Sequence, residues 1–138
     1  MMRLNKKQRQ QIFDKFNGLC AYSGTPLEDD WQADHIKPII RYFYGCKTKH
    51  PEDDNLGNLV PCQKVINHYK HQLSLEEFRT WYLGNLHLKL QKLPKNPRTE
   101  KSKKRIAYMR KIASYFGITE KIPFSGTFYF ETIDKTNN

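Results

Sequence analysis

Apolar residues recur at helical spacing near the start of the chain. Ile12, Phe13 and Phe16 share one face of a helix predicted over residues 5–16, and Gly18 follows just after its end. The chain is therefore expected to begin with an amphipathic helix that buries this face.

The pattern then changes to short apolar runs bounded by turn residues. Residues 20–27 are predicted to form a short strand that turns at Ser23-Gly24. Residues 31–36 are predicted to form a second short strand, which Pro38 ends. Residues 41–57 form a polar loop that is long for a small domain, which indicates an insertion or a function. A short helix is predicted over residues 63–71.

Helical signals dominate the second half. Residues 74–77, Ser-Leu-Glu-Glu, form a capping box that starts a helix. Leucines in residues 86–93 fit a helix and also a strand, and we favour the helix. A third helix is predicted over residues 99–116, with Gly117 as its cap. Its buried face is expected to consist of Ile106, Met109, Ile112, Ala113 and Phe116.

Residues 122–132 alternate with a period of two and are predicted to be extended, with a turn at Ser125-Gly126. Large aromatic side chains are the expected core of the flanking elements. These are Phe13, Phe16, Trp31, Phe78 and Trp81.

Composition restricts the class of protein. The chain has 138 residues, 38% of them hydrophobic, which suits one modest domain, with or without an appended arm. It has no apolar run of the roughly 20 residues that a membrane span needs, and no signal peptide is expected. Three cysteines without a C-x-x-C pair do not form a disulfide framework. A cytoplasmic, prokaryotic or phage-like setting and no membrane partner are expected.

The charge is unevenly distributed. The formal net charge is +10, of which residues 1–80 carry +2 and residues 81–138 carry +8. Residues 89–111 hold ten basic residues and one acidic residue. Such a stretch favours contact with the phosphates of DNA over an ordinary solvated helix face. The expected DNA-binding residues of its helix are Lys103, Lys104, Arg105, Arg110 and Lys111.

Three polar motifs could carry the chemistry of phosphodiester hydrolysis. They are residues 34–38 (Asp-His-Ile-Lys-Pro), residues 54–59 around Asn58, and residues 67–70 (Asn-His-Tyr-Lys). A neutral imidazole can deprotonate water near pH 7. Oxygen ligands can hold a hard divalent cation that neutralises charge on the phosphate.

The order and spacing of these motifs resemble the HNH endonuclease family, whose catalytic unit is the ββα-metal fold. The family pattern has a C-x-x-C or C-x-S/T-G turn, a D-H-I-x-P strand end, N-L after a variable loop, and a helix with N-x-x-K or H-x-x-K. Corresponding residues here are 20–24, 34–38, 58–62 and 67–70. The match covers about half of the chain.

The resemblance implies a role for each matching residue. His35 would be the general base, and Asp34 and Asn67 would hold one Mg²⁺ or Mn²⁺ ion. Asn58 would hydrogen-bond the loop backbone and keep the strand of the base in place, and Lys70 would lie near phosphate. The products would carry 5′-phosphate and 3′-hydroxyl ends.

Two departures from the family pattern matter. Many members hold a structural zinc ion with two cysteine pairs, but here Ser23 and Val65 replace the second cysteine of each pair. Cys20 and Cys62, with the distant Cys46, make a poor zinc site, so no structural zinc is expected.

The second departure concerns the metal ligand on the short helix. His68 and His71 remain alternatives to Asn67. Asp53 and Asp54 are expected to face solvent, although the long loop could bring them into the metal site.

These observations predict an α+β protein. Residues 1–80 would form an HNH ββα-metal core with an N-terminal helix. Residues 81–138 would form a basic helical extension that ends in an extended segment and packs on the core.

The predicted function is metal-dependent DNA hydrolysis. The alternatives are a non-catalytic nucleic-acid-binding module and a structural or partner-binding protein. A homodimer is left open, because no interface can be identified from the sequence.

Overall fold

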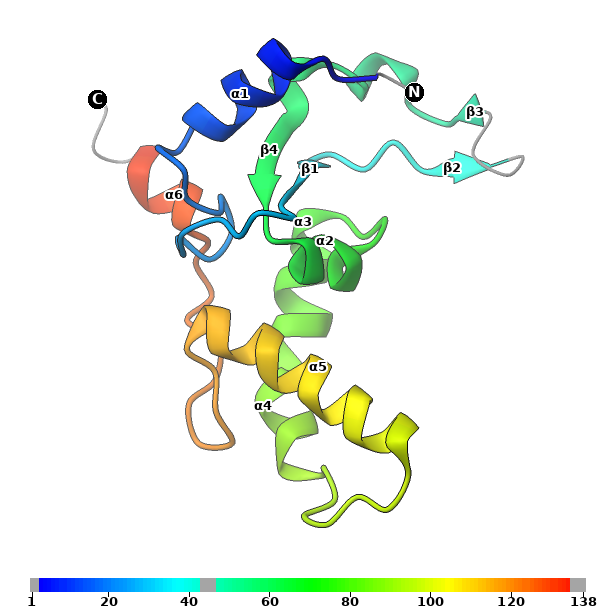
Figure 1. Cartoon of the computed structure of the whole chain (residues 1–138), viewed down its shortest axis with the longest axis vertical. Coiled ribbons are helices and arrows are strands. Elements are labelled where there is room, and N and C mark those ends of the chain that lie inside the picture. The colour runs from blue at the N-terminus through cyan, green and yellow to red at the C-terminus, as the bar shows by residue number, and fades with distance from the viewer. Residues whose placement is uncertain (1–2, 43–46, 135–138) are drawn as a thin grey trace. The chain divides into compact units, whose positions relative to one another are not determined.

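The computed structural model describes residues 3–42 and 47–134, and the chain divides into two compact units. The first unit contains the described residues up to Leu75 together with those from Phe128 onward, and the second is Glu76–Thr127. The charge distribution alone predicts a boundary slightly later, between residues 80 and 81. The combination of helices with a small antiparallel sheet makes this an α+β protein (Figure 1).

Helix α1, Lys6–Asp14, opens the first unit within the predicted range. Asn5 caps it, because its side chain accepts from the Gln8 amide while the Gln8 side chain accepts from the Asn5 amide. Ile12 is fully buried and packs with Trp31 and other apolar side chains. Helix α1 thus contributes to the hydrophobic core of the first unit, which also contains the polar motifs.

The main sheet has two antiparallel strands, β1 (Gln32–His35) and β4 (Leu59–Cys62). Helix α2, Lys64–Lys70, follows β4 and contacts β1. Along the chain, the two strands of the main sheet are therefore followed by a helix that contacts one of them. Between the strands lie β2 (Arg41–Tyr42) and β3 (Lys47–Thr48). They are followed by two 3-10 helices, η1 (Pro51–Asp53) and η2 (Leu56–Asn58).

Residues 20–27 make the predicted turn at Ser23-Gly24, but the strand predicted there is wrong. The segment folds back on itself, and Leu19 and Pro26 form only an isolated bridge. The amide of Gly24 donates to the carbonyl of Cys20 at 2.8 Å, and Gly24 has a φ of +72°. This tight turn leaves too few residues on either side for a ladder.

The extended segment predicted over residues 122–132 is also wrong in its second part. Residues from Tyr129 to Asp134 form helix α6. The carboxylate of Glu131 accepts from the amide of Phe128 at 2.8 Å, which satisfies a donor at the start of the helix. The period-two pattern does not reveal this local cap.

Contacts with distant residues explain why α6 belongs to the first unit. The amide of Tyr129 donates to the carbonyl of Tyr22 at 3.0 Å, and that of Phe130 to the carbonyl of Ala21 at 2.9 Å. The fully buried ring of Phe128 lies edge-on to the ring of Tyr22 at 5.4 Å. The C-terminal segment is thus held by residues more than a hundred positions earlier.

The second unit is helical. It begins within α3 (Leu75–Glu77) and continues through the π-helix η3 (Phe78–Leu83), α4 (Gly84–Gln91) and α5 (Glu100–Phe116). Helix α4 confirms the helical interpretation of residues 86–93, and α5 matches its predicted range with its predicted Gly117 cap. None of the described helices is both long enough and apolar enough to cross a membrane.

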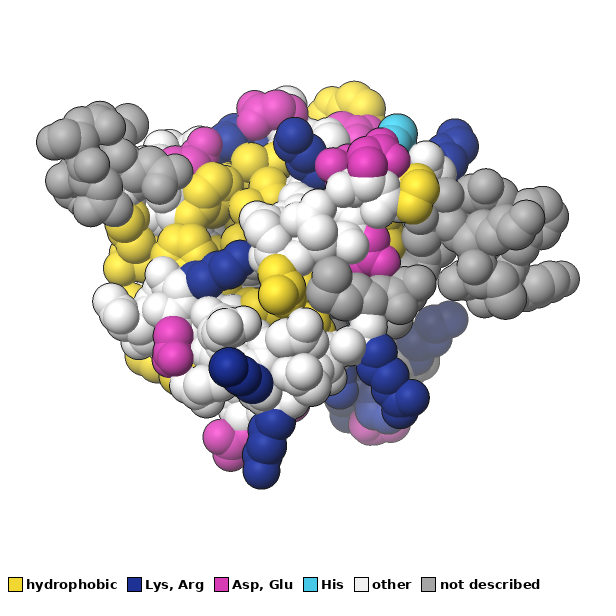
Figure 2. All heavy atoms as spheres, turned by 90° about the horizontal axis from the view of Figure 1, so that it is seen from above, with side chains coloured by type: hydrophobic (Ala, Val, Ile, Leu, Met, Phe, Trp, Pro, Cys, Tyr) yellow, Lys and Arg dark blue, Asp and Glu magenta, His cyan; other side chains and the backbone are white. Residues whose placement is uncertain are grey.

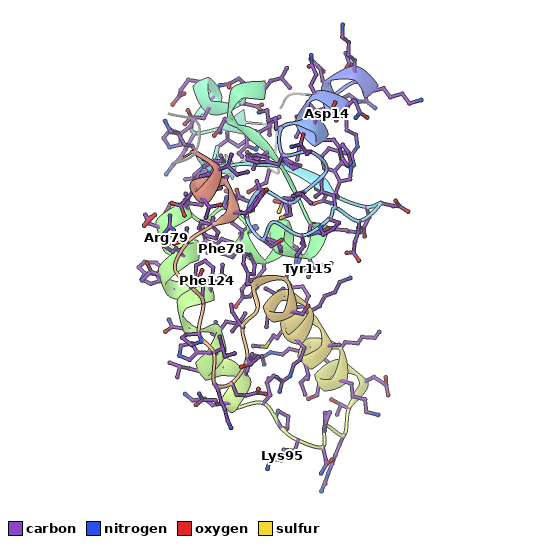
Figure 3. All side chains as sticks on the ribbon, turned by 90° about the vertical axis from the view of Figure 1, so that its left-hand side faces the viewer. Asp14, Phe78, Arg79, Lys95, Tyr115 and Phe124 are labelled. Carbon is purple, nitrogen blue, oxygen red and sulfur yellow. The ribbon has the colours of Figure 1, made fainter. Side chains whose placement is uncertain are left out.

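The expected core position of Trp81 is wrong, since its side chain is 59% exposed. Trp81 lies in η3, where the amide of Gly84 donates to the carbonyl of Arg79, five residues earlier. This wider turn shifts the face that an α-helical pattern would bury. Phe78, by contrast, is buried and packs edge-on against Phe116 at 6.5 Å, and Figure 3 labels Phe78 on this unit.

Candidate functional site

Strand β1 ends in two polar residues, Asp34 and His35, whose side chains leave on opposite faces. Asp34 pairs with Val60 and His35 with Leu59 across the sheet. Asp34 is only 7% exposed, and the His35 side chain is 14% exposed. Because strand side chains alternate, the two groups can serve one site only where the strand stops. The strand does stop at His35.

The carboxylate of Asp34 is held by two neighbours at the same oxygen. The hydroxyl of Tyr22 donates to Oδ2 at 2.6 Å, and Nζ of Lys70 lies 3.1 Å from Oδ2. Burial, and then the charge of Asp34, raise the pKa of Tyr22 well above its usual 10.0, so the phenol stays protonated and donates.

Lys70 does not take the position expected of a phosphate-binding residue. Its side chain is fully buried, and Nζ also donates to the backbone carbonyl of His35 at 3.0 Å. A buried ammonium ion in an ion pair does not contact a DNA backbone in this arrangement. Lys70 instead fixes the end of β1 from within the first unit.

Asn58 joins the end of β1 to the loop that precedes β4. Its Oδ1 accepts from the Lys37 amide at 2.9 Å, and its Nδ2 donates to the Lys37 carbonyl at 2.9 Å and to the Asp53 carbonyl at 2.8 Å. Its own carbonyl accepts from the Ile36 amide at 3.0 Å. Asn58 thus connects the backbone at Lys37 with the backbone at Asp53.

The ring of His35 meets a carboxylate that was expected to face solvent. Nε2 of His35 lies 2.9 Å from Oδ1 of Asp54, and the two side chains are 14% and 11% exposed. The solvent-facing expectation for Asp54 is therefore wrong. Asp54 lies in an irregular loop, where no periodic pattern could have indicated that it reaches back to the strand end.

Asn67 lies on α2 against the same face of β1 as Asp34. Its Nδ2 donates to Oε1 of Gln32 at 2.7 Å, and Gln32 and Asp34 share a face because they are two residues apart. Lys70, one turn further along α2, reaches Asp34 itself. Of the two alternative ligands, His68 is exposed on α2 and His71 is exposed just after the helix.

The donor types at this face suit a hard divalent cation. Tyr22 and Lys70 both contact Oδ2 of Asp34, which leaves Oδ1 as the oxygen that a cation could take. The amide of Asn67 uses its nitrogen toward Gln32, so its oxygen is the atom left for a metal. Mg²⁺ is commonly held by one or two protein oxygens together with water and substrate phosphate. By donor type, Asp34 and Asn67 therefore suit such an ion.

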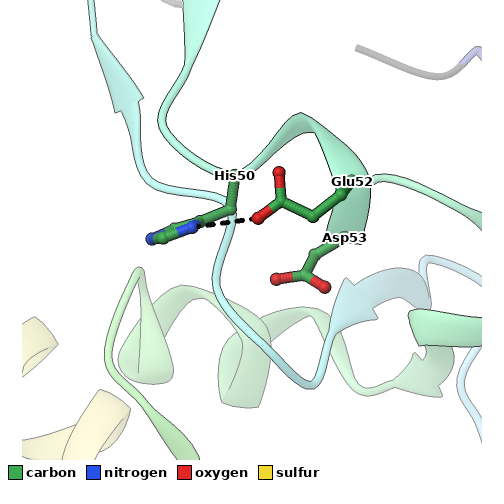
Figure 4. Close-up of side chains that lie close together, drawn as sticks. All are labelled: His50, Glu52 and Asp53. Atoms are coloured by element: carbon green, nitrogen blue, oxygen red, sulfur yellow. Dashed lines mark hydrogen bonds and ion pairs between the residues drawn. The ribbon is translucent and has the colours of Figure 1, made fainter.

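A second group of possible metal ligands lies around η1. The ligand atoms of His50, Glu52 and Asp53 all lie within 4.8 Å of one another, and Nδ1 of His50 is 3.3 Å from Oε1 of Glu52 (Figure 4). Acidic side chains also gather beside a histidine on the face seen in Figure 2. His50 and Glu52 are exposed, and exposed acidic groups are common without an ion.

Two buried thiols, those of Cys20 and Cys62, are close enough to form a hydrogen bond. Burial by itself would raise the pKa of Cys20, but hydrogen bonds with Cys62 and Ser23 outweigh it and lower the pKa from 9.0 to about 6. Burial, and then the hydrogen bond with Cys20, raise the pKa of Cys62 well above 9.0. Cys46, the distant third cysteine considered as a zinc ligand, lies outside the described residues.

The second unit carries most of the positive charge. Residues Glu76–Thr127 contain twelve Lys and Arg against four Asp and Glu, a net of +8. On α5, Met109, Ile112 and Ala113 are buried. Lys103, Lys104, Arg105, Arg110 and Lys111 are all exposed.

Lys103 and Arg110 form ion pairs with acidic residues. Lys103 pairs with Glu100 at 3.4 Å, and Arg110 pairs with Glu120. Surface pairs of this kind are weak, so both cations could exchange partners with a phosphate. Lys95 adds a further cation in the loop between α4 and α5 (Figure 3).

Comparison of the chain with protein-family models, with curated proteins and with solved structures gave no match. The resemblance to HNH endonucleases rests on the residues and motifs alone.

Proposed function

We propose that this protein is a metal-dependent HNH-type endonuclease that hydrolyses phosphodiester bonds in DNA. One observation carries the proposal. The strand end with Asp34 and His35 is held from one side by Asn58, and it is covered by the helix that bears Asn67. This is the arrangement that the ββα-metal resemblance requires of residues far apart in the sequence.

His35 has the chemistry of a general base. A neutral imidazole nitrogen takes a proton from water, and the oxygen of that water attacks the scissile phosphorus. The bond to the 3′ oxygen then breaks, which leaves 5′-phosphate and 3′-hydroxyl ends. The backbone around His35 is held by two side chains: Lys70 donates to the carbonyl of His35, and Asn58 accepts from the amide of Lys37. The imidazole therefore extends from a fixed strand end.

Asp34 and Asn67 are the residues that would hold the divalent cation. A bound Mg²⁺ or Mn²⁺ ion would neutralise negative charge on the phosphate and the leaving oxygen. Lys70 and Tyr22 keep the Asp34 carboxylate in place through Oδ2.

The second unit is proposed to bind the DNA backbone. Its net charge of +8 and the exposed basic residues of α5 provide the sequence-independent attraction that phosphate recognition needs.

The test is incubation of supercoiled plasmid with the protein and Mg²⁺, Mn²⁺ or a chelator. We expect nicking or linearisation with either metal and none with the chelator. Asn67→Ala should reduce cleavage at least tenfold, whereas Asp30→Asn, an exposed carboxylate, should have no effect. A wild-type protein that is inert with every metal would refute the nuclease proposal.

One observation favours a second candidate, a non-catalytic DNA-binding module. The ion pair with Lys70 already balances the charge of Asp34 without a metal. Binding of DNA that weakens steeply with salt, with no cleavage in any metal, would support this alternative.

A further inference from the structure

We infer that Asp54 is a positioning residue for His35, and that it makes Nδ1 the ring nitrogen that accepts the proton. This inference rests on the proposed nuclease function. It assigns a role to a loop carboxylate outside the four segments that match the family pattern.

The contact between His35 and Asp54 determines which nitrogen of the imidazole ring carries the proton. Nε2 of His35 lies 2.9 Å from Oδ1 of Asp54. An ionised carboxylate can only accept hydrogen bonds, so Nε2 must carry the proton of the neutral imidazole. The lone pair of the neutral ring is then on Nδ1. The side chains are 14% and 11% exposed, so the bond is sheltered from competing water.

The loop that carries Asp54 is itself held in place. The amide of Asp54 donates to the carbonyl of Pro51 at 3.1 Å, which closes η1. Nδ2 of Asn55 donates to the carbonyl of Glu52 at 2.8 Å. These two hydrogen bonds, at Asp54 and at the next residue, hold the backbone that carries the Asp54 carboxylate.

Asn58 connects this loop to the strand of the base. Its Nδ2 binds the carbonyl of Asp53, the residue before Asp54, and also that of Lys37, two residues after His35. One side chain thus fixes the separation between the two backbones that present the carboxylate and the imidazole.

This geometry gives Asp54 a defined effect on the proposed step. When Nδ1 takes the proton from water, the ring becomes positively charged and the adjacent carboxylate stabilises it. The water oxygen forms its bond to phosphorus while the bond to the 3′ oxygen breaks, and that oxygen takes a proton from solvent. The proton on Nδ1 then returns to solvent, which restores the neutral ring. A second group that orients a catalytic base is a general feature of such sites.

Nitrogen-15 NMR of the His35 ring tests the assignment without any cleavage. The spectrum is recorded in the absence of metal, at a pH high enough that the nitrogen shifts no longer change with pH, so that the ring is neutral. We expect Nε2 to be the protonated nitrogen, and Asp54→Ala to remove this preference. A ring protonated mainly at Nδ1 in the wild type would overturn the inference.

Kinetics separate positioning from metal binding. We expect Asp54→Asn to lower kcat at least about a hundredfold, and up to the roughly ten-thousandfold seen when a base loses its orienting carboxylate. The half-saturating Mn²⁺ concentration should be unchanged. Asp54→Glu should recover part of the loss, and Asp29→Asn, an exposed carboxylate, should match the wild type. A higher half-saturating Mn²⁺ concentration with recovery of kcat at saturating metal would make Asp54 a metal ligand and overturn the inference.

The two measurements also distinguish this inference from the proposed function. A protein that cuts no DNA but shows the expected tautomer would refute the nuclease while supporting the Asp54–His35 pairing. A protein that cuts DNA at an unchanged kcat in Asp54→Asn would refute the positioning role while supporting the nuclease.

Discussion

Lys70 and Asp34 form a buried ion pair at the centre of the first unit. Their charged atoms are 3.1 Å apart, and their side chains are 1% and 8% exposed. Tyr22 donates to the same carboxylate oxygen at 2.6 Å. The pair joins α2 to β1, so its loss would affect both the fold and the placement of His35.

Replacement of Lys70 by methionine should destabilise the protein by about 3–5 kcal/mol, because it leaves the Asp34 charge buried without compensation. Lys64→Met, at an exposed position on the same helix, should change stability by less than about 0.5 kcal/mol. Urea unfolding measures both. Removing both charges with Asp34→Asn in the Lys70→Met background should recover part of the loss, and a double variant that is no more stable than Lys70→Met would argue against the pair.

A pair of glycine substitutions tests the packing of α6 on the first unit. A methyl group at Gly24 would lie 2.8 Å from a ring carbon of Tyr129, whereas one at Gly126 would meet nothing within 4 Å. Their φ angles, +72° and +88°, impose similar backbone strain on alanine. We expect Gly126→Ala to cost about 1 kcal/mol and Gly24→Ala about 1–3 kcal/mol more. Equal losses on urea unfolding would mean that Tyr129 does not pack there.

The buried thiol pair should make stability depend on pH. The pKa of Cys20 is about 6 in the folded protein and 9.0 ordinarily, so between these values the unfolded chain binds more protons. The Cys20 contribution should therefore be complete above pH 9, and it should be lost as the pH falls through about 6. For one proton, its slope should be at most about 1.4 kcal/mol per pH unit.

The raised pKa of Cys62 acts in the opposite direction. Its stabilising contribution is present below pH 9, the ordinary thiol value, and decreases as the pH rises above it. The check is the pH dependence of the urea midpoint for the wild type and for Cys20→Ser. An identical dependence from pH 6 to 9 would contradict the lowered Cys20 pKa.

The basic surface of α5 should account for much of the salt dependence of DNA binding. Removing one cation that binds a phosphate reduces the slope of log K against log salt by about 0.9. Replacing Lys103, Lys104 and Arg105 with alanine should lower the slope by up to about 3. Lys6→Ala/Lys7→Ala, at exposed positions of α1, should change it little. Fluorescence anisotropy with a labelled duplex measures the slopes, and equal slopes for the wild type and the triple variant would exclude this surface.

Local signals in the sequence predicted much of the fold. Thr99 caps α5 through its side chain, and Gly117 ends the helix in the left-handed conformation, so both ends could be predicted from the residues themselves. Asp34 and Asn58 could also be identified, because their motifs have a characteristic order along the chain.

Long-range and irregular features could not be predicted in the same way. Asp54 contacts His35 from 19 positions further along the chain, beyond β2, β3 and η1, and no periodicity describes this contact. Helix α6 depends on backbone hydrogen bonds to Ala21 and Tyr22, far away in sequence. The exposure of Trp81 follows from a five-residue turn that an α-helical pattern does not anticipate.

The proposed nuclease depends above all on His35 as the group that deprotonates the attacking water. Single-turnover cleavage of DNA by His35→Gly, with and without added imidazole, tests this role. We predict a loss of at least about a hundredfold without imidazole, the usual contribution of a general base, and partial recovery as imidazole fills the vacated space. Cleavage by His35→Gly at the wild-type rate, with no response to imidazole, would contradict the assignment of His35 as the base.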